Sequence, residues 1–207
     1  MFSFKFPAAI LLFSLAVSAT SIARQATIPR SCTPALDGVN VSIFTANEFS
    51  KWGTPTVPPK AGQAIIEVAP PLFINLAANW HLAQPDGGSE YTIEAITDTS
   101  LVITASDSLS GALKLKKSAS YDEHQRWNIA CLTCIPDADN TTPPDGVVAS
   151  GCTIRSPLNG FCATIAATGA RPHPVLLEGC SSISSSSSNG DGGQVTFNLV
   201  KTLPQPR

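Results

Sequence analysis

The stretch Gln125-Arg126-Trp127-Asn128-Ile129 ends a run of short segments that begins at Tyr91. Two other stretches are similar to it, Asn79-Trp80-His81-Leu82 and Val195-Thr196-Phe197-Asn198-Leu199. In each, an aromatic residue stands two positions before Ile or Leu, with a polar residue between them. On a β-strand this spacing places the aromatic and aliphatic side chains on one face and the polar side chain on the other. Three such endings indicate one supersecondary unit that is repeated three times.

The segment from residue 91 to residue 129 has the clearest strand pattern. Its hydrophobic residues alternate with polar ones, as Leu113 and Leu115 do around Lys114. Such alternation is typical of a strand that is buried on one face. The strands predicted for this unit are 91–96, 101–105, 112–116 and 125–129. The segments predicted as turns or polar connections between them are 97–100, 107–111 and 118–124.

The flanking segments follow the same order of short strands and turns. The strands predicted for the first unit are 39–44, 63–68 and one or two within 72–82, and those for the third unit are 150–154, 161–166, 175–180 and 195–200. The insert 136–146 and the flexible serine tract 181–188 are predicted as loops, and the proline-rich segment 48–60 as a loop or a proline-limited edge strand. The mature chain contains no predicted amphipathic helix. The fold class is therefore predicted to be all-β, with short strands forming a barrel closed by hairpins.

Residues 1–23 are predicted to be a secretory signal peptide. Lys5 supplies the positive charge, and residues 8–17 form an apolar run that is too short for a comfortable membrane span. Small residues follow, with candidate cleavage sites after Ala19 and Ala23. We therefore expect a secreted, extracellular protein.

The rest of the chain is long enough for one domain with its own hydrophobic core. Its predicted parts are an N-terminal arm (24–38), the β domain (39–200, with repeats at about 39–84, 90–134 and 150–200) and a tail (201–207). The formal net charge of −2 is small, and the charged residues are dispersed. This composition does not suggest nucleic acid or a membrane as a partner.

Six cysteines follow the signal peptide, Cys32, Cys131, Cys134, Cys152, Cys162 and Cys180. An even number in a secreted chain predicts up to three disulfides, although sequence alone does not fix their pairing. Cys131 and Cys134 have the spacing of a zinc or redox motif. No second ligand pair accompanies them, and they follow a predicted strand instead of starting a helix. We favour structural disulfides that join these two cysteines to Cys32 and Cys152, and we predict no metal site.

Two sequence motifs are acceptors for N-glycosylation. Asn40 begins Asn-Val-Ser and Asn140 begins Asn-Thr-Thr. Such acceptors need to lie in exposed loops of a secreted protein. We keep both as candidate glycosylation sites.

No constellation of catalytic residues is visible. The three histidines, His81, His124 and His173, fall in different repeats, and Asp122 and His124 are too close in sequence to favour a catalytic dyad. The sequence contains no nucleophile elbow, zincin helix or phosphate-binding loop. We predict no enzymatic activity and no cofactor. Trp52 lies in a proline-rich segment and has two possible roles. Its ring could stack on a ligand or cap the end of the barrel.

The three repeats and the Gln125-Arg126-Trp127 motif resemble the ricin B-chain-type β-trefoil lectins over residues 39–200. In that family the fourth strand of each repeat carries Gln-x-Trp, and the Trp packs in the core. The resemblance implies a β-trefoil of three four-stranded repeats, with Trp80, Gln125, Trp127 and Phe197 as core repeat markers. A Cys on the second strand pairs there with one that ends the third, which implies a Cys162–Cys180 disulfide. The serine tract and proline-rich inserts are similar to features of secreted fungal trefoil proteins.

The residues that form the family's sugar pocket are not kept. That pocket needs an Asp after the second-strand Cys, an aromatic residue on the third strand and an Asn or Gln near Gln-x-Trp. The third repeat has Ala163 or Thr164 and Glu178 at the first two positions. The second repeat has Ile103-Thr104 and Lys116, with His124 before Gln125. No carbohydrate-binding residue is therefore assigned from the resemblance.

The leading functional hypothesis is a non-enzymatic protein that binds a glycan. The alternatives are a protein-binding trefoil, such as a protease inhibitor that presents residues 48–60 or 136–146, and a secreted effector without a small ligand. A shallow pocket that combines exposed Tyr or Trp with Asp or Asn would favour the lectin. A single rigid loop that projects alone would favour a partner that is an extracellular protein.

Overall fold

The computed structural model describes residues 31–47, 49–70, 79–141, 146–166, 171–180 and 196–202. The predicted signal peptide, the serine tract and residues 72–78 of the segment predicted to hold one or two strands lie outside these residues. The described elements are, in chain order, β1 (Val39–Thr45), β2 (Lys51–Gly53), β3 (Ile66–Val68), β4 (Trp80–Ala83), η1 (Pro85–Gly87), β5 (Thr92–Ala95), β6 (Asp98–Thr104), β7 (Lys114–Lys117), η2 (Glu123–Gln125), β8 (Asn128–Ala130), β9 (Thr133–Cys134), α2 (Ala138–Thr141), β10 (Val147–Arg155), β11 (Cys162–Ile165), β12 (Val175–Glu178) and β13 (Phe197–Lys201).

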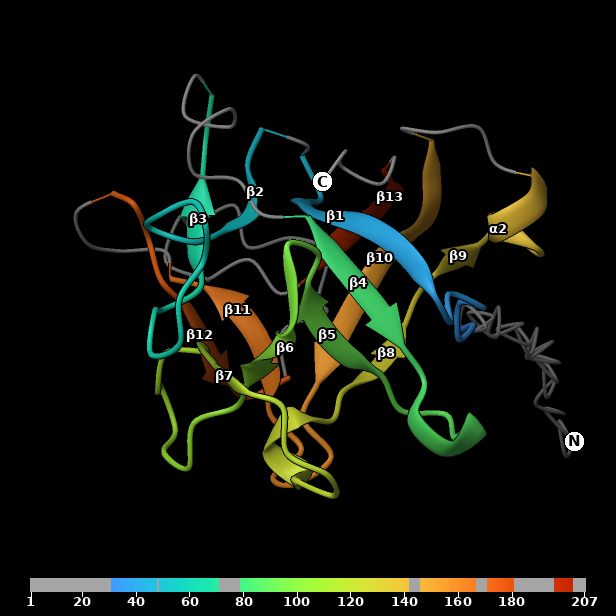
Figure 1. Ribbon diagram of the computed structural model, residues 1–207. Helices are drawn as coiled ribbons and strands as arrows, with labels where there is room; N and C mark the ends of the chain where they lie inside the picture. Colours follow the sequence, from blue (N-terminus) through green and yellow to red (C-terminus); the bar gives the residue numbers. More distant parts are fainter. Residues whose placement is uncertain are drawn as a thin grey trace, which may run out of the picture.

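The first and last strands of the three repeats close into a barrel (Figure 1). Strand β1 pairs with β4 and with β13, β4 pairs with β5, and β10 pairs with β13 and with β8. The remaining gap, between β5 and β8, is closed by a bridge between Tyr91 and Trp127. Their backbone groups exchange two hydrogen bonds, of 2.8 and 2.9 Å. A closed ring leaves no exposed edge along these strands.

The two middle strands of each repeat form a hairpin, and the three hairpins meet one another. The hairpins are β2–β3, β6–β7 and β11–β12. Isolated bridges join them, namely Ala64 to Lys114, Ala112 to Leu176 and Ile66 to Pro174. Strands β3, β7, β11 and β12 gather at the left of Figure 1, beside the barrel strands. The protein is therefore a β-trefoil of three four-stranded repeats, as the resemblance implied.

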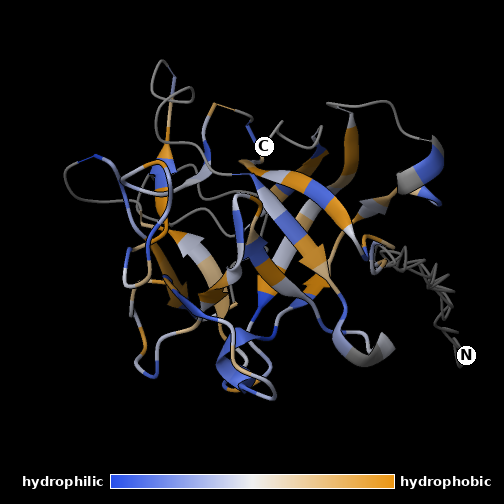
Figure 2. Ribbon diagram, viewed as in Figure 1, coloured by the Kyte–Doolittle hydropathy of each residue, from blue (hydrophilic) through white to orange (hydrophobic). Residues whose placement is uncertain are grey.

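The repeat markers Trp80, Trp127 and Phe197 are completely buried in the core. Hydrophobic and hydrophilic residues alternate along β1 and β4, as Figure 2 shows, so the hydrophobic side chains of these strands face the core. Trp52 is also fully buried, and its ring packs edge-on against Phe197 with the ring centroids 5.1 Å apart. Trp52 thus packs in the core, and the interpretation of this residue as a ligand-stacking ring is wrong.

All six cysteines form disulfides, which join Cys32 to Cys134, Cys131 to Cys152 and Cys162 to Cys180. The predicted Cys162–Cys180 pair is present, and Cys131 and Cys134 bond to Cys152 and Cys32. The Cys32–Cys134 bond ties the N-terminal arm to the segment after β8 across 102 residues of chain. Closing so long a loop restricts the unfolded chain and so favours the folded state.

The structure decides one open prediction and corrects one predicted turn and one predicted loop. Residues 51–53, for which the sequence left a loop or a proline-limited edge strand, form β2, which precedes Pro55 and pairs with both β1 and β3. Residues 98–100, predicted as a turn, begin β6, and the chain reverses at residues 96–97 instead. The insert 136–146 includes one helical turn, α2, although no helix was predicted. Tertiary pairing has overridden the local preference in the first two cases.

Gln125 provides a further correction, because it lies in η2 and not in the predicted strand 125–129. The strand itself is shorter and begins at Asn128. The reason is that the Gln125 side chain turns inward to bond backbone groups of the preceding loop, a contact that a strand would not provide.

Candidate functional site

The buried amide of Gln125 holds the loop that leads into it. Gln125 is 3% exposed. Its Nε2 donates a hydrogen bond to the Lys117 carbonyl (3.0 Å), and its Oε1 accepts one from the Ala119 N–H (2.9 Å). The Asp122 carboxylate caps η2 by accepting a bond from the His124 N–H (3.0 Å). Both ends of residues 118–122 are therefore fixed by side chains.

This fixed loop presents Tyr121 to solvent. The side chain is 83% exposed, and the backbone φ is +65°, in the left-handed region that residues with side chains rarely adopt. Large exposed aromatic rings and left-handed backbone both carry a free-energy cost, and such features concentrate at binding sites. The loop thus keeps an aromatic face available for contact with a ligand.

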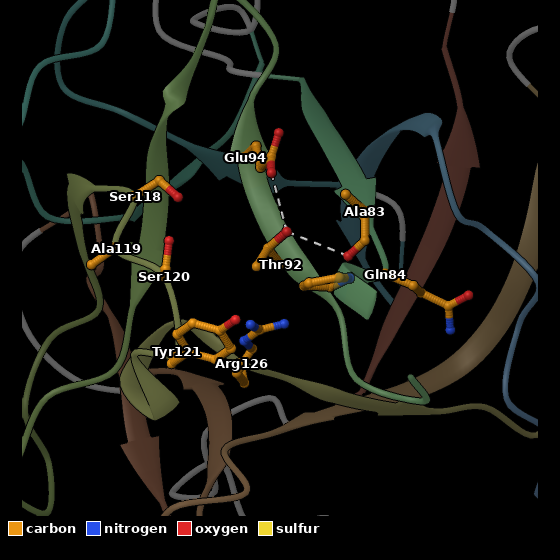
Figure 3. Close-up of a pocket in the computed structure, with 10 residues that line it drawn as sticks. Ala83, Gln84, Thr92, Glu94, Ser118, Ala119, Ser120, Tyr121 and Arg126 are labelled. Carbon is orange, nitrogen blue, oxygen red and sulfur yellow. Dashed lines mark hydrogen bonds between the residues drawn. The ribbon is translucent and has the colours of Figure 1, made fainter. Parts of the chain in front are cut away.

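Tyr121 stands at one wall of a polar cleft of about 280 Å³ (Figure 3). The opposite wall is formed by β4 and β5. There the Thr92 hydroxyl lies 3.1 Å from Glu94 Oε1 and 3.3 Å from the Ala83 carbonyl. The residues that line the cleft are Ala83, Gln84, Pro85, Thr92, Glu94, Ser118, Ala119, Ser120, Tyr121 and Arg126. The cleft thus lies between the last strand of the first repeat and the second repeat.

The cleft combines three different chemical groups. Arg126 is half-buried, and no carboxylate of a described residue lies within ion-pair distance of its guanidinium. Glu94 accepts one hydrogen bond from Thr92, so its second carboxylate oxygen is available as an acceptor. Tyr121 adds an aromatic face. A guanidinium donor, a carboxylate acceptor and a ring are the groups that engage the hydroxyls and the apolar face of a sugar.

The positions that the lectin resemblance would use do not contribute to this cleft. Ala163, Thr164, Ile103 and Thr104 are all buried, so their side chains do not face solvent. Lys116 is exposed on β7 and Glu178 is half-buried on β12, but neither lines the cleft.

The His124 ring pairs with Asp107 and not with its sequence neighbour Asp122. His124 Nε2 lies 3.2 Å from the Asp107 carboxylate, whereas Asp122 bonds the backbone of His124 and not its ring. His81 Nδ1 lies 2.9 Å from Asn40 Oδ1, and His173 is buried. Within the described part of the chain, no three His, Cys, Asp or Glu residues are placed to hold a metal ion. The described helices also lack the length and apolar composition of a membrane-spanning segment.

Sequence reasoning missed the residues of the cleft. Arg126 is the middle residue of the repeat motif, Tyr121 lies in a segment predicted only as a polar connection, and Glu94 is the polar residue of an alternating strand. The one available signal was an aromatic residue inside a polar connection. All three residues belong to the second repeat, and the bridge between Tyr91 and Trp127 places β5 beside the segment that carries Tyr121 and Arg126.

The sequence matches no family model and no curated protein. The fold is similar to that of Cry35Ab1, at a TM-score of 0.54 and 16% identity over 82% of this chain and 38% of that chain. The designed threefold-symmetric protein ThreeFoil matches at a TM-score of 0.53 and 14% identity, over 79% of this chain and 99% of that one. A Polyporus squamosus lectin bound to the epitope Neu5Aca2-6Galb1-4GlcNAc matches at a TM-score of 0.51 and 12% identity, over 79% of this chain and 49% of that chain. This chain spans less than half of Cry35Ab1 and of the lectin, and the likeness concerns the fold alone.

Proposed function

We propose that this protein is a secreted, non-enzymatic protein that binds carbohydrate in the cleft between β4–β5 and residues 118–121. The observation that carries this proposal is the exposed ring of Tyr121, which is held in a left-handed backbone beside Arg126 and Glu94. The three disulfides accord with secretion. The shape of the cleft, shallow and polar with one aromatic ring, supports a glycan better than an apolar small molecule.

A protein-binding function is the second candidate, and it is supported by one loop of the first repeat. Between β2 and β3, the Gln63 side chain donates to Thr56 Oγ1 (2.5 Å) and accepts from the Lys60 N–H (2.9 Å). These bonds brace a proline-rich segment that exposes Val57. A braced, exposed loop loses little conformational entropy when it docks into a partner protein such as a protease.

The test is a glycan array probed with the mature, oxidised protein that begins at residue 24. Tyr121→Ala and Arg126→Met remove the ring and the cation of the cleft. Phe49→Ala serves as the matched control, because Phe49 is 73% exposed and does not line the cleft. We expect a hit that free sugar competes away, that each cleft variant weakens by about tenfold or more, equal to about 1.4 kcal/mol, and that Phe49→Ala leaves unchanged.

Two results would contradict the proposal. A blank array with correctly folded protein would exclude binding of the glycans tested, and a hit that survives both cleft substitutions would place binding elsewhere. In the first case a panel of extracellular proteases would test the loop between β2 and β3, with Gln63→Ala as the variant that loosens it.

A further inference from the structure

The two glycosylation motifs occupy different environments, although both were expected in exposed loops. Asn40 lies within β1, half-buried, with its amide oxygen 2.9 Å from His81 Nδ1. Ser42, the third residue of its motif, is 2% exposed and donates a hydrogen bond to Asn79. Asn140 is exposed and lies in the one-turn helix α2. The expectation of an exposed loop is therefore wrong for Asn40, and Asn140 is the accessible acceptor.

Asn140 has a fixed position relative to the barrel. Ala138 at the start of α2 is fully buried, and its carbonyl accepts a hydrogen bond from Lys201 Nζ on β13 (3.0 Å). The Asn140 N–H donates to the Asp137 carbonyl (2.9 Å). A glycan attached to Asn140 would thus begin from a defined point on the surface.

Asn140 also borders a hollow of about 200 Å³ whose other walls include Asp37, Asp137 and Gln84. The Asp37 carboxylate accepts a bond from the Gln84 N–H (2.7 Å), which joins the N-terminal arm to the end of β4. Gln84 lines both this hollow and the cleft. In Figure 3 its side chain points away from Tyr121 and Arg126.

We propose that Asn140 carries an N-linked glycan whose first sugar residues occupy this hollow, and that the glycan shields the neighbouring cleft. The Asp37 and Asp137 carboxylates and the Gln84 amide supply the acceptors and donors that sugar hydroxyls require. An N-linked glycan is bulky and extends beyond its first residues, so it reaches past Gln84. Trimming of the glycan then opens the cleft. The inference rests on the proposed secretion and binding function.

Tyrosine nitration tests the shielding without a known ligand. The chain has two tyrosines, and nitration by tetranitromethane acts on the phenolate. Tyr121 is exposed, whereas Tyr91 is fully buried, and burial raises the pKa of Tyr91, so Tyr91 serves as an internal reference. The full chain is secreted from a glycosylating host as wild type, Asn140→Gln and Asn40→Gln, and the glycan at each asparagine is measured by mass spectrometry.

We expect a glycan on Asn140 in the wild type and in Asn40→Gln, with Tyr121 nitrated several-fold more slowly than in Asn140→Gln. Enzymatic removal of the glycan from wild-type protein should restore the fast rate without any substitution. An unmodified Asn140, or equal nitration rates with the glycan present, would overturn the proposal. A glycan array run with wild type and Asn140→Gln separates the two ideas. If neither protein binds the array but Tyr121 is nitrated slowly in the wild type, only the carbohydrate-binding proposal is contradicted. If both proteins give equal hits, only the shielding proposal is contradicted.

Discussion

The first and second repeats each bury a tryptophan at the equivalent position, but the two indole rings differ in their polar contacts. Trp127 and Trp80 are both completely buried. The Trp127 Nε1–H donates to the Ile103 carbonyl at 3.1 Å, whereas Trp80 Nε1 has no acceptor among the described residues. Two positions before Trp127 stands Gln125, and two positions before Trp80 the sequence has Ala78. Apolar burial is thus common to the two tryptophans, whereas among the described residues only the Trp127 indole N–H has an acceptor.

The cleft lies where those polar contacts are. Gln125 sits beside the core residue Trp127 and bonds the loop that carries Tyr121, so one side chain connects the packing of the core to the surface. In the third repeat Phe197 has no ring N–H to donate. The comparison indicates that hydrophobic packing determines the trefoil, and that in the second repeat the amide of Gln125 supports the surface loop of residues 118–122.

The largest effect is expected from truncating either tryptophan. Trp127→Ala and Trp80→Ala should each lower the free energy of unfolding by about 3–5 kcal/mol, because both leave a large cavity in the core. Denaturant unfolding measures both values. If Trp80→Ala cost under about 2 kcal/mol, the two rings would not be equivalent core residues, and the comparison would fail at its first step.

Gln125→Ala should cost less, about 1–3 kcal/mol, because it deprives the Lys117 carbonyl and the Ala119 N–H of their partner. Hydrogen exchange at Ala119 should accelerate, and any ligand of the cleft should bind more weakly while Trp127 stays buried. Gln63→Ala is the matched control, since Gln63 also bonds a loop N–H but is less buried. Equal losses of stability for the two variants would show that the burial of Gln125 does not matter.

Much of the fold followed from the sequence, because strand alternation and the aromatic spacing are local signals. These signals predicted the order of strands in the second and third repeats, whereas the Cys162–Cys180 pair and the core positions of Trp80, Trp127 and Phe197 were implied by the resemblance to β-trefoil lectins. Gln125 was assigned to a strand by periodicity alone. Its backbone N–H instead bonds the Asp122 carbonyl, and its side chain bonds residues six and eight positions earlier, contacts that periodicity does not reveal. The cleft could not be predicted either, since it depends on the bridge between Tyr91 and Trp127 and on the pairing of β4 with β5.

The indole N–H alone can be tested by conservative substitutions. Trp127→Phe and Trp80→Phe remove similar ring volumes, but only the first leaves the Ile103 carbonyl without its donor. We expect Trp127→Phe to be the more destabilising by about 1 kcal/mol. Chemical denaturation of the two variants in parallel supplies the difference. Equal values would mean that the Trp127–Ile103 bond adds nothing to the stability of the second repeat.

The ion pair between His124 and Asp107 should matter least, although it lies in the same repeat. The Asp107 side chain is 88% exposed, so solvent and salt screen its interaction with the imidazole. Asp107→Asn should change the free energy of unfolding by ~0.5 kcal/mol or less and leave Tyr121 nitration unaltered, because Gln125 and Asp122 already hold the loop. Denaturant unfolding at low and high salt gives the value. A loss as large as that of Gln125→Ala would instead assign the support of the loop to the ion pair, and the difference between the repeats would then be one of charge.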